Sequence, residues 1–214
     1  MIRRFSFLAA LTAGLCCLAC LNGADKDKEK IDKDDEKDPF AELIGKPAPD
    51  FTGDFAINGK PTKISALKGK VVLIDFWAVW CGPCIGAFPH LRELNDKYKE
   101  QGLEVVGVTS YEEQYGFDKE KGELTPLDDD KKLSRSEEQN MLKDFAAHYK
   151  LDYLVMTVPR DERKKVFLTD YKAEGIPQLV VIDRKGVIRM VKAGNSPENV
   201  KALTEKIAEL VKEK

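Results

Sequence analysis

Excess basic charge is missing from this 214-residue chain, and histidine is scarce. Lys and Arg total 35 against 37 for Asp and Glu, a net charge of −2, which argues against a nucleic-acid-binding protein. With only His90 and His148 present, mechanisms that need a histidine cluster lack their residues. The chain is 43% hydrophobic and 34% charged, which fits neither a fully disordered chain nor a polytopic membrane protein.

Residues 1–24 have the layout of an export signal. Arg3 and Arg4 supply positive charge, and residues 5–21 then carry none. Three outcomes stay open for this segment: cleavage near residues 19–24, lipid attachment at Cys20, or retention as an uncleaved membrane anchor. Each predicts an extracytoplasmic, for example periplasmic, protein that is secreted or membrane-tethered and contacts the membrane only through this segment.

Residues 25–39 are predicted to be a charged, disordered linker. Positions 25–38 read DKDKEKIDKDDEKD, with eight acidic residues, five lysines and one apolar side chain. Such a segment cannot bury enough apolar surface to offset the entropy lost on ordering. A charged, solvated helix is the alternative, and either structure would act as a spacer.

Residues 40–214 alternate between strand-like and helix-like patterns, which predicts a single α/β domain. Residues 111–133 are polar and acid-rich and are predicted to form a long loop. Ser136 with Gln139 resembles a capping box at the start of the following helix. Strands are expected at 70–77, 103–109, 153–158, 178–182 and 187–191, with a turn at 183–186, and helices at 83–101, 136–149, 162–174 and 197–214.

The chemistry is expected at Cys81 and Cys84, which stand three positions apart between a strand and a helix. One helical turn brings positions i and i+3 to the same face, within reach of a disulfide. The partial positive charge and free N–H groups of a helix N-terminus favour a thiolate. Cys81, nearer the helix end, is therefore the expected attacking thiolate, and Cys84 the resolving thiol.

Two other roles for the cysteine pair are weaker. A purely structural disulfide would close a four-residue loop and remove little entropy from the unfolded chain. A zinc site needs four ligands, and only His90 and His148 could add to the two sulfurs, at no finger-like spacing. We therefore expect no metal and no bound cofactor, only a redox-active disulfide between Cys81 and Cys84.

Residues 71–84, VVLIDFWAVWCGPC, closely resemble the active-site strand and motif of the thioredoxin superfamily. Residues 44–51, IGKPAPDF, and 67–70, LKGK, resemble the amino-terminal extension of the TlpA/ResA-like proteins, which are membrane-tethered thiol-disulfide oxidoreductases outside the cytoplasm. The resemblance implies a three-layer sandwich with a central mixed β-sheet flanked by helices. An amino-terminal β extension and an insert near residues 111–150 would be added to it.

The same resemblance implies a substrate-binding surface around the cysteines. Residues 175–177, Gly-Ile-Pro, match the loop whose proline is cis in this superfamily, which assigns that place to Pro177. The backbone of Ile176 would then pair with an extended substrate strand. Trp80, Gly82 and Pro83 would form the rim. An ordinary trans proline in a turn is the alternative for Pro177.

Asp75 is the third expected catalytic residue. A carboxylate inside an apolar strand is costly to bury in its ionised form, so its pKa should rise and it could accept a proton from Cys84. The position matches a buried acid of thioredoxins. A hydrogen-bonded structural acid is the alternative reading of this residue.

These residues together predict a thiol-disulfide oxidoreductase that reduces protein disulfides through a mixed-disulfide intermediate. The expected partners are disulfide-containing exported proteins, with apocytochrome c as one example through cytochrome c maturation, and a membrane thiol electron donor. A peroxiredoxin-like thiol peroxidase is an alternative, although Ala78 stands where that chemistry usually has Thr or Ser. The second alternative is a redox-inert tethered binding module.

Overall fold

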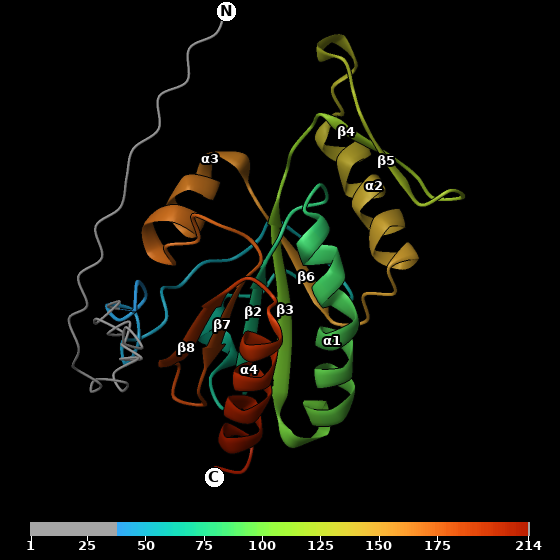
Figure 1. Cartoon of the computed structure of the whole chain (residues 1–214). Coiled ribbons are helices and arrows are strands. Elements are labelled where there is room, and N and C mark those ends of the chain that lie inside the picture. Colours follow the sequence, from blue (N-terminus) through green and yellow to red (C-terminus); the bar gives the residue numbers. More distant parts are fainter. Residues whose placement is uncertain (1–37, 214) are drawn as a thin grey trace, which may run out of the picture. The chain divides into compact units, whose positions relative to one another are not determined.

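The computed structural model describes residues 38–213 and is shown in Figure 1. The predicted export segment at 1–24 and nearly all of the predicted linker at 25–39 lie outside these residues. Within residues 38–213, no helix has the length and apolar character needed to cross a lipid bilayer.

Six strands in this part of the chain form one mixed sheet, in the order β1-β6-β3-β2-β7-β8. β2, β3 and β6 are parallel, whereas β1, β7 and β8 each run antiparallel to the strand they join. This confirms the mixed central sheet, and the amino-terminal extension adds β1 at one edge. The strands are β1 (Phe55–Ile57), β2 (Val71–Phe76), β3 (Leu103–Ser110), β6 (Leu154–Val158), β7 (Gln178–Ile182) and β8 (Ile188–Ala193).

Helices cover both faces of the sheet and give the predicted three layers. α1 (Gly82–Tyr98), α2 (Arg135–His148) and α4 (Pro197–Leu210) bury their apolar side chains in one core, and Figure 1 shows α1 and α4 in front of the strands. The second core, on the other face, takes side chains from the π-helical turn Lys164–Asp170 that follows α3 (Arg160–Arg163). The four inner strands, β2, β3, β6 and β7, are buried on both faces, which explains their largely apolar sequences.

The prediction of a plain loop at residues 111–133 is wrong. This segment contains a hairpin of β4 (Tyr115–Asp118) and β5 (Glu123–Pro126). The Phe117 ring packs on α2, with its centroid 5.2 Å from that of Phe145 and 5.5 Å from that of His148. The segment is polar except for a few apolar side chains that anchor it. Its composition alone therefore indicates a loop.

The capping box of α2 lies two residues before the predicted one. Ser134 is the N-cap: its hydroxyl accepts a hydrogen bond from the backbone N–H of Glu137 at 3.4 Å. The Glu137 carboxylate accepts one from the Ser134 N–H at 2.8 Å. Ser136 and Gln139 are three positions apart, as are Ser134 and Glu137. The sequence therefore fits a capping box in two registers, and the predicted one is wrong.

Other elements agree with the sequence to within a few residues. Ser196 caps α4 by accepting a hydrogen bond from the Asn199 N–H at 3.3 Å, although the helix ends at Leu210 rather than at 214. The helix expected at 162–174 begins at Arg160 and continues as the π-helical turn. Residues 183–186 form the expected turn between β7 and β8, where Gly186 adopts a φ of 83°, a value that suits glycine.

Arg184, in this turn, binds together four chain segments at the end of the sheet opposite α3. Its guanidinium donates hydrogen bonds of 2.8 to 3.0 Å to four backbone carbonyls, those of Gly69, Gln101, Val211 and Glu213. The bonds connect the β7–β8 turn to the start of β2, the turn after α1 and the carboxyl-terminal end.

We therefore expect Arg184→Ala to lower the free energy of unfolding by about 2 kcal/mol, because several charge-assisted hydrogen bonds are lost together. Urea denaturation of the purified variant measures this loss. The neighbouring Lys185 is exposed, and Lys185→Ala is the matched control, with an expected change within about 0.5 kcal/mol. Equal losses in both variants would show that the four carbonyl contacts add nothing.

Candidate active site

The two cysteines lie where β2 ends and α1 begins. The Trp77 N–H donates to the Val108 carbonyl of β3 at 3.0 Å. This bond holds the chain beside β3 just past the end of β2. A turn follows, in which the Cys81 N–H donates to the Ala78 carbonyl at 3.0 Å. Cys81 is the N-cap of α1, and Pro83 occupies its first turn, a position that tolerates proline because the N–H there has no helical partner.

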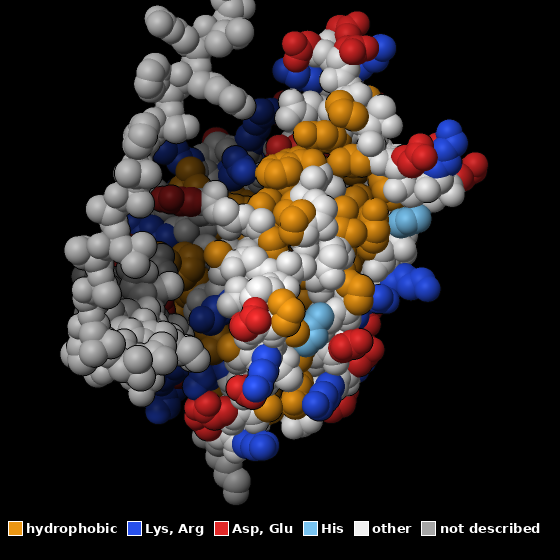
Figure 2. Space-filling model, in the orientation of Figure 1, with side chains coloured by type: hydrophobic (Ala, Val, Ile, Leu, Met, Phe, Trp, Pro, Cys, Tyr) orange, Lys and Arg blue, Asp and Glu red, His pale blue; other side chains and the backbone are white. Residues whose placement is uncertain are grey.

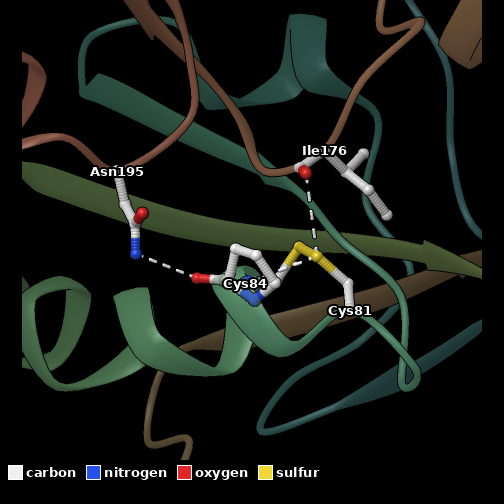
Figure 3. The surroundings of a disulfide bond; sticks show 5 residues. Cys81, Cys84, Ile176 and Asn195 are labelled. Atoms are coloured by element: carbon white, nitrogen blue, oxygen red, sulfur yellow. Dashed lines mark hydrogen bonds between the residues drawn. A yellow bond between two sulfur atoms is a disulfide. The ribbon is translucent and has the colours of Figure 1, made fainter. Parts of the chain in front are cut away.

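The structure contains the expected disulfide between Cys81 and Cys84, with the Cα atoms 5.2 Å apart (Figure 3). The Cys84 N–H also donates to the Cys81 sulfur at 3.2 Å. When the disulfide opens, this N–H and the helix dipole favour negative charge on Cys81. Cys84 is fully buried, whereas 4% of Cys81 is exposed. Of the two cysteines, the one at the helix end is therefore the more exposed.

The Ile176–Pro177 peptide bond is cis, and it precedes β7 directly beside the disulfide. The Ile176 carbonyl oxygen lies 3.7 Å from the Cys81 sulfur, as Figure 3 shows. In the disulfide neither sulfur bears a hydrogen, so this approach is a contact. In the reduced protein the Cys81 thiol could donate a hydrogen bond to this carbonyl. β7 pairs with β2, with Phe76 opposite Gln178, which brings Ile176 to the cysteines.

The other predicted rim residues are exposed around the disulfide. Trp80 is 44% exposed, and Gly82 and Pro83 are also exposed. No atom lies within 4 Å of the place where a Cβ on Gly82 would stand, so neighbouring atoms do not require glycine there. The surface next to Cys81 is therefore open to a partner, which fits a site that exchanges disulfides with proteins.

Asn195 also contacts the site, although no sequence motif includes it. Its side-chain amide donates to the Pro83 carbonyl at 3.0 Å from the loop between β8 and α4 (Figure 3). The contact ties the first turn of α1 to a loop more than a hundred residues further along the chain. Only its contact with Pro83 identifies Asn195 as part of the site, because an Asn before a helix is otherwise an ordinary loop residue.

Asp75 is fully buried in β2, and burial raises its pKa to about 8. Neither carboxylate oxygen has a hydrogen-bond partner among the described residues. No protein group among these residues therefore provides the hydrogen bond that the alternative of a hydrogen-bonded structural acid would need. The same observation means that no hydrogen bond joins Asp75 to either cysteine, so a proton passing between Cys84 and Asp75 needs a bridging water or a local movement.

The surroundings of Asp75 explain why its charged form is so poorly stabilised. Asp75 pairs with Gly107 of β3, so the neighbouring strand places no side chain beside it. A Cβ on Gly107 would come within 3.0 Å of the Trp77 indole nitrogen and 3.2 Å of the Tyr153 ring. That indole nitrogen and the Tyr153 hydroxyl are also buried without hydrogen-bond partners among the described residues. Among residues 38–213, Asp75 thus lies near neutral polar groups, and no ion pair offsets the effect of its burial.

The arrangement has the groups that thiol-disulfide exchange needs. Within residues 38–213, no three His, Cys, Asp or Glu side chains group closely enough to hold a metal ion. The site joins a sulfur at a helix N-terminus, a buried second sulfur one turn further on, and a buried acid whose pKa lies near that of a thiol.

Comparisons with known proteins agree with this chemistry. The Redoxin family model matches residues 43–209. The thiol-disulfide oxidoreductase ResA of a Bacillus cereus strain is 30% identical over 165 residues, which cover 77% of this chain and 78% of that protein.

Solved structures share the fold as well. A Chlorobium tepidum protein assigned as the thiol:disulfide interchange protein DsbE has 28% identity and a TM-score of 0.55, covering 78% of this chain and 97% of that one. A thioredoxin-like protein in its oxidised form has 26% identity and a TM-score of 0.53, covering 77% and 94% of the two chains. The chain therefore belongs to the Redoxin family and, within the thioredoxin superfamily, to the ResA/TlpA-like thiol-disulfide oxidoreductases.

Proposed function

We propose that the protein reduces disulfides of exported proteins outside the cytoplasm. The Cys81 thiolate attacks one sulfur of a substrate disulfide, which forms a mixed disulfide and releases the other substrate sulfur to take up a proton. The Cys84 thiolate then attacks the Cys81 sulfur and releases the second substrate thiol. Two electrons pass to the substrate, and the Cys81–Cys84 disulfide remains.

The observation that carries this proposal is the disulfide itself, formed at the N-terminus of α1 between a slightly exposed cysteine and a fully buried one. The Ile176 carbonyl lies 3.7 Å from the Cys81 sulfur. This closeness supports substrate recognition in which the substrate backbone lies along the segment at Ile176. Asp75, with its pKa of about 8, would accept the proton from Cys84, because transfer is most efficient between groups of similar pKa.

The reductive direction rests on the residues between the cysteines. Gly82 and Pro83 are the pair found in thioredoxin, whose reduction potential is about −270 mV, against about −120 mV for the oxidant DsbA. A protein with a potential near the lower value donates electrons to disulfides of higher potential, whereas structural disulfides of secreted proteins, typically below about −300 mV, resist it. A membrane thiol electron donor would then reduce the Cys81–Cys84 disulfide again.

The location outside the cytoplasm is supported by residues 1–24, with their basic start and uncharged run, and by the charged segment that follows. Disulfides persist in oxidising compartments, so substrates for a reductase are present there. Exported proteins with paired cysteines form the substrate class, and apocytochrome c falls within it.

Reduction of insulin disulfides tests the proposed activity. With dithiothreitol as the electron source, the protein should accelerate the precipitation of the insulin B chain well beyond dithiothreitol alone. A doubly substituted protein, Cys81→Ser with Cys84→Ser, is the control and should match the uncatalysed rate. A wild-type rate no faster than this control would contradict the proposal.

A further inference from the structure

A cleft of about 330 Å³ lies next to the active site and plays no part in the exchange chemistry described above. It is formed where β3 and β6 end, together with α3 and the π-helical turn. Two apolar or aromatic side chains, three basic ones and one acidic one line it: Tyr111, Leu168, Arg160, Arg163, Lys164 and Glu112.

Trp80 connects this cleft to the cysteines. Its indole lies within hydrogen-bonding reach of the Glu112 carboxylate, and the next residue in the chain is Cys81. In the sheet, β3 and β6 lie on one side of β2, and β7, which follows Ile176, lies on the other. A substrate segment that reaches Cys81 along Ile176 would therefore meet Trp80 and the cleft if it continued over the ends of the strands, from β7 towards β3 and β6.

The cleft has unbalanced positive charge. Arg160 is paired with Glu113 at 2.6 Å, but neither Arg163 nor Lys164 lies within 4 Å of a carboxylate among the described residues. The Nε of Arg163 is buried and has no hydrogen-bond partner in that part of the chain. Glu112 is the one acidic side chain in the lining; burial raises its pKa, while the nearby Arg163 and Arg160 act to lower it.

Exposed apolar side chains stand beside these charges. Trp80 is 44% exposed and Leu168 is 42% exposed, and both are large enough to contact a bound peptide. In Figure 2, Lys and Arg side chains border the upper left of a broad apolar area, at the place where α3 lies in Figure 1. The exposed Lys164 and the half-buried Arg163 thus stand beside an apolar rim, an arrangement that favours an acidic side chain with apolar neighbours.

We propose that this cleft binds an acidic side chain of the substrate polypeptide, close in sequence to the cysteine that Cys81 attacks. Arg163 and Lys164 provide the charge and the hydrogen-bond donors, and Trp80 and Leu168 contact the neighbouring substrate residues. The proposal rests on the proposed function for its substrate, and it adds a preference for disulfides flanked by Asp or Glu.

Model peptides test the preference on the full-length protein. Three Gly- and Ser-rich peptides, each with one internal disulfide, carry three Glu, three Gln or three Lys residues beside one cysteine. The rate of their reduction is divided by the rate for hydroxyethyl disulfide, which has no charge and is too small to reach the cleft. The Glu peptide should react roughly threefold to fivefold faster than the Gln peptide, and the Lys peptide slowest. This preference should disappear in 1 M salt.

Two adjacent lysines provide matched variants. Lys164→Glu should abolish or reverse the preference for the Glu peptide. Lys165→Glu makes the same change in net charge, but Lys165 does not line the cleft and pairs with Asp170 at 2.7 Å, so the preference should persist. Equal loss in both variants would indicate a general field effect and overturn the cleft assignment.

A binding experiment separates this proposal from the proposed function. Peptides with Ser in place of Cys are titrated into the disulfide form, and the change in tryptophan fluorescence, to which the exposed Trp80 contributes, reports binding without chemistry. Tighter binding of the Glu peptide than of the Lys peptide, lost in Arg163→Gln, supports the cleft even if no disulfide is reduced. Equal affinities for the two peptides would overturn the proposal, even if hydroxyethyl disulfide is reduced at a normal rate.

Discussion

Cys81→Ser should lower the rate of disulfide reduction about a thousandfold or more, because serine provides no thiolate at neutral pH. Cys84→Ser should instead stop the reaction after its first step. The accessible Cys81 would still attack a substrate disulfide, and without Cys84 the mixed disulfide would persist. Electrophoresis without reducing agent and mass spectrometry of the intact adduct measure this product.

The adduct assigns the two sulfurs their roles. Both variants are made in a chain with Cys16, Cys17 and Cys20 replaced by serine, so that no other thiol contributes. The fully buried Cys84 should form no adduct in the Cys81→Ser protein, because a substrate sulfur cannot reach it. An adduct on Cys84 as abundant as that on Cys81 would reverse the assignment.

Asp75→Asn should stabilise the disulfide form of the protein, increasingly so as the pH rises. Burial raises the pKa of Asp75 from 3.8 to about 8 in the folded protein. Between these values the folded state holds a proton that the unfolded chain has lost, so stability falls as the pH increases. Asparagine does not titrate and removes this effect. The variant should gain on the order of 4 kcal/mol at pH 7 and almost nothing below pH 4.

Urea denaturation of the oxidised protein from pH 4 to pH 9 measures the gain. Asp183 provides a control of opposite sign. Burial acts to raise its pKa, but hydrogen bonds from the backbone N–H groups of Val187 and Lys185 and from Arg189 lower the pKa overall. Asp183→Asn should therefore destabilise the protein at neutral pH and have less effect in acid. A gain from Asp75→Asn that is the same at every pH would contradict a raised pKa for Asp75.

The same substitution separates the proton-transfer role from the structural one. If Asp75 accepts the proton of Cys84, Asp75→Asn should slow the release of a Cys81 mixed disulfide near pH 7. The difference should diminish as the pH rises, because hydroxide can then take the proton in place of Asp75. Release at the wild-type rate across this range would leave Asp75 without a part in the reaction.

Local patterns were enough to predict the site's core. The positions of Cys81 and Cys84 follow from a buried strand, a Pro in the first helical turn and a spacing of one turn, all of which are read from adjacent residues. Asp75 was recognisable because a charged residue interrupts an apolar strand. The α/β class followed from alternating periodicity, and the turn at 183–186 from its glycine.

Features that depend on distant contacts were not predictable in this way. Asn195 reaches Pro83 across more than a hundred residues, and the cleft at Arg163 and Lys164 exists because β6 pairs with β3. The β4–β5 hairpin owes its place to Phe117 packing on α2, a contact that composition does not reveal. A sequence pattern predicts a residue's local conformation, but not which element will pack against it.

The reduction potential of the Cys81–Cys84 pair tests the central claim most directly. The protein is equilibrated in dithiothreitol or glutathione buffers of known potential, its free thiols are alkylated, and mass spectrometry gives the reduced fraction. A reductase of exported protein disulfides should have a value near or below about −230 mV. A value above about −150 mV would make the pair an oxidant or isomerase and contradict the reductive role.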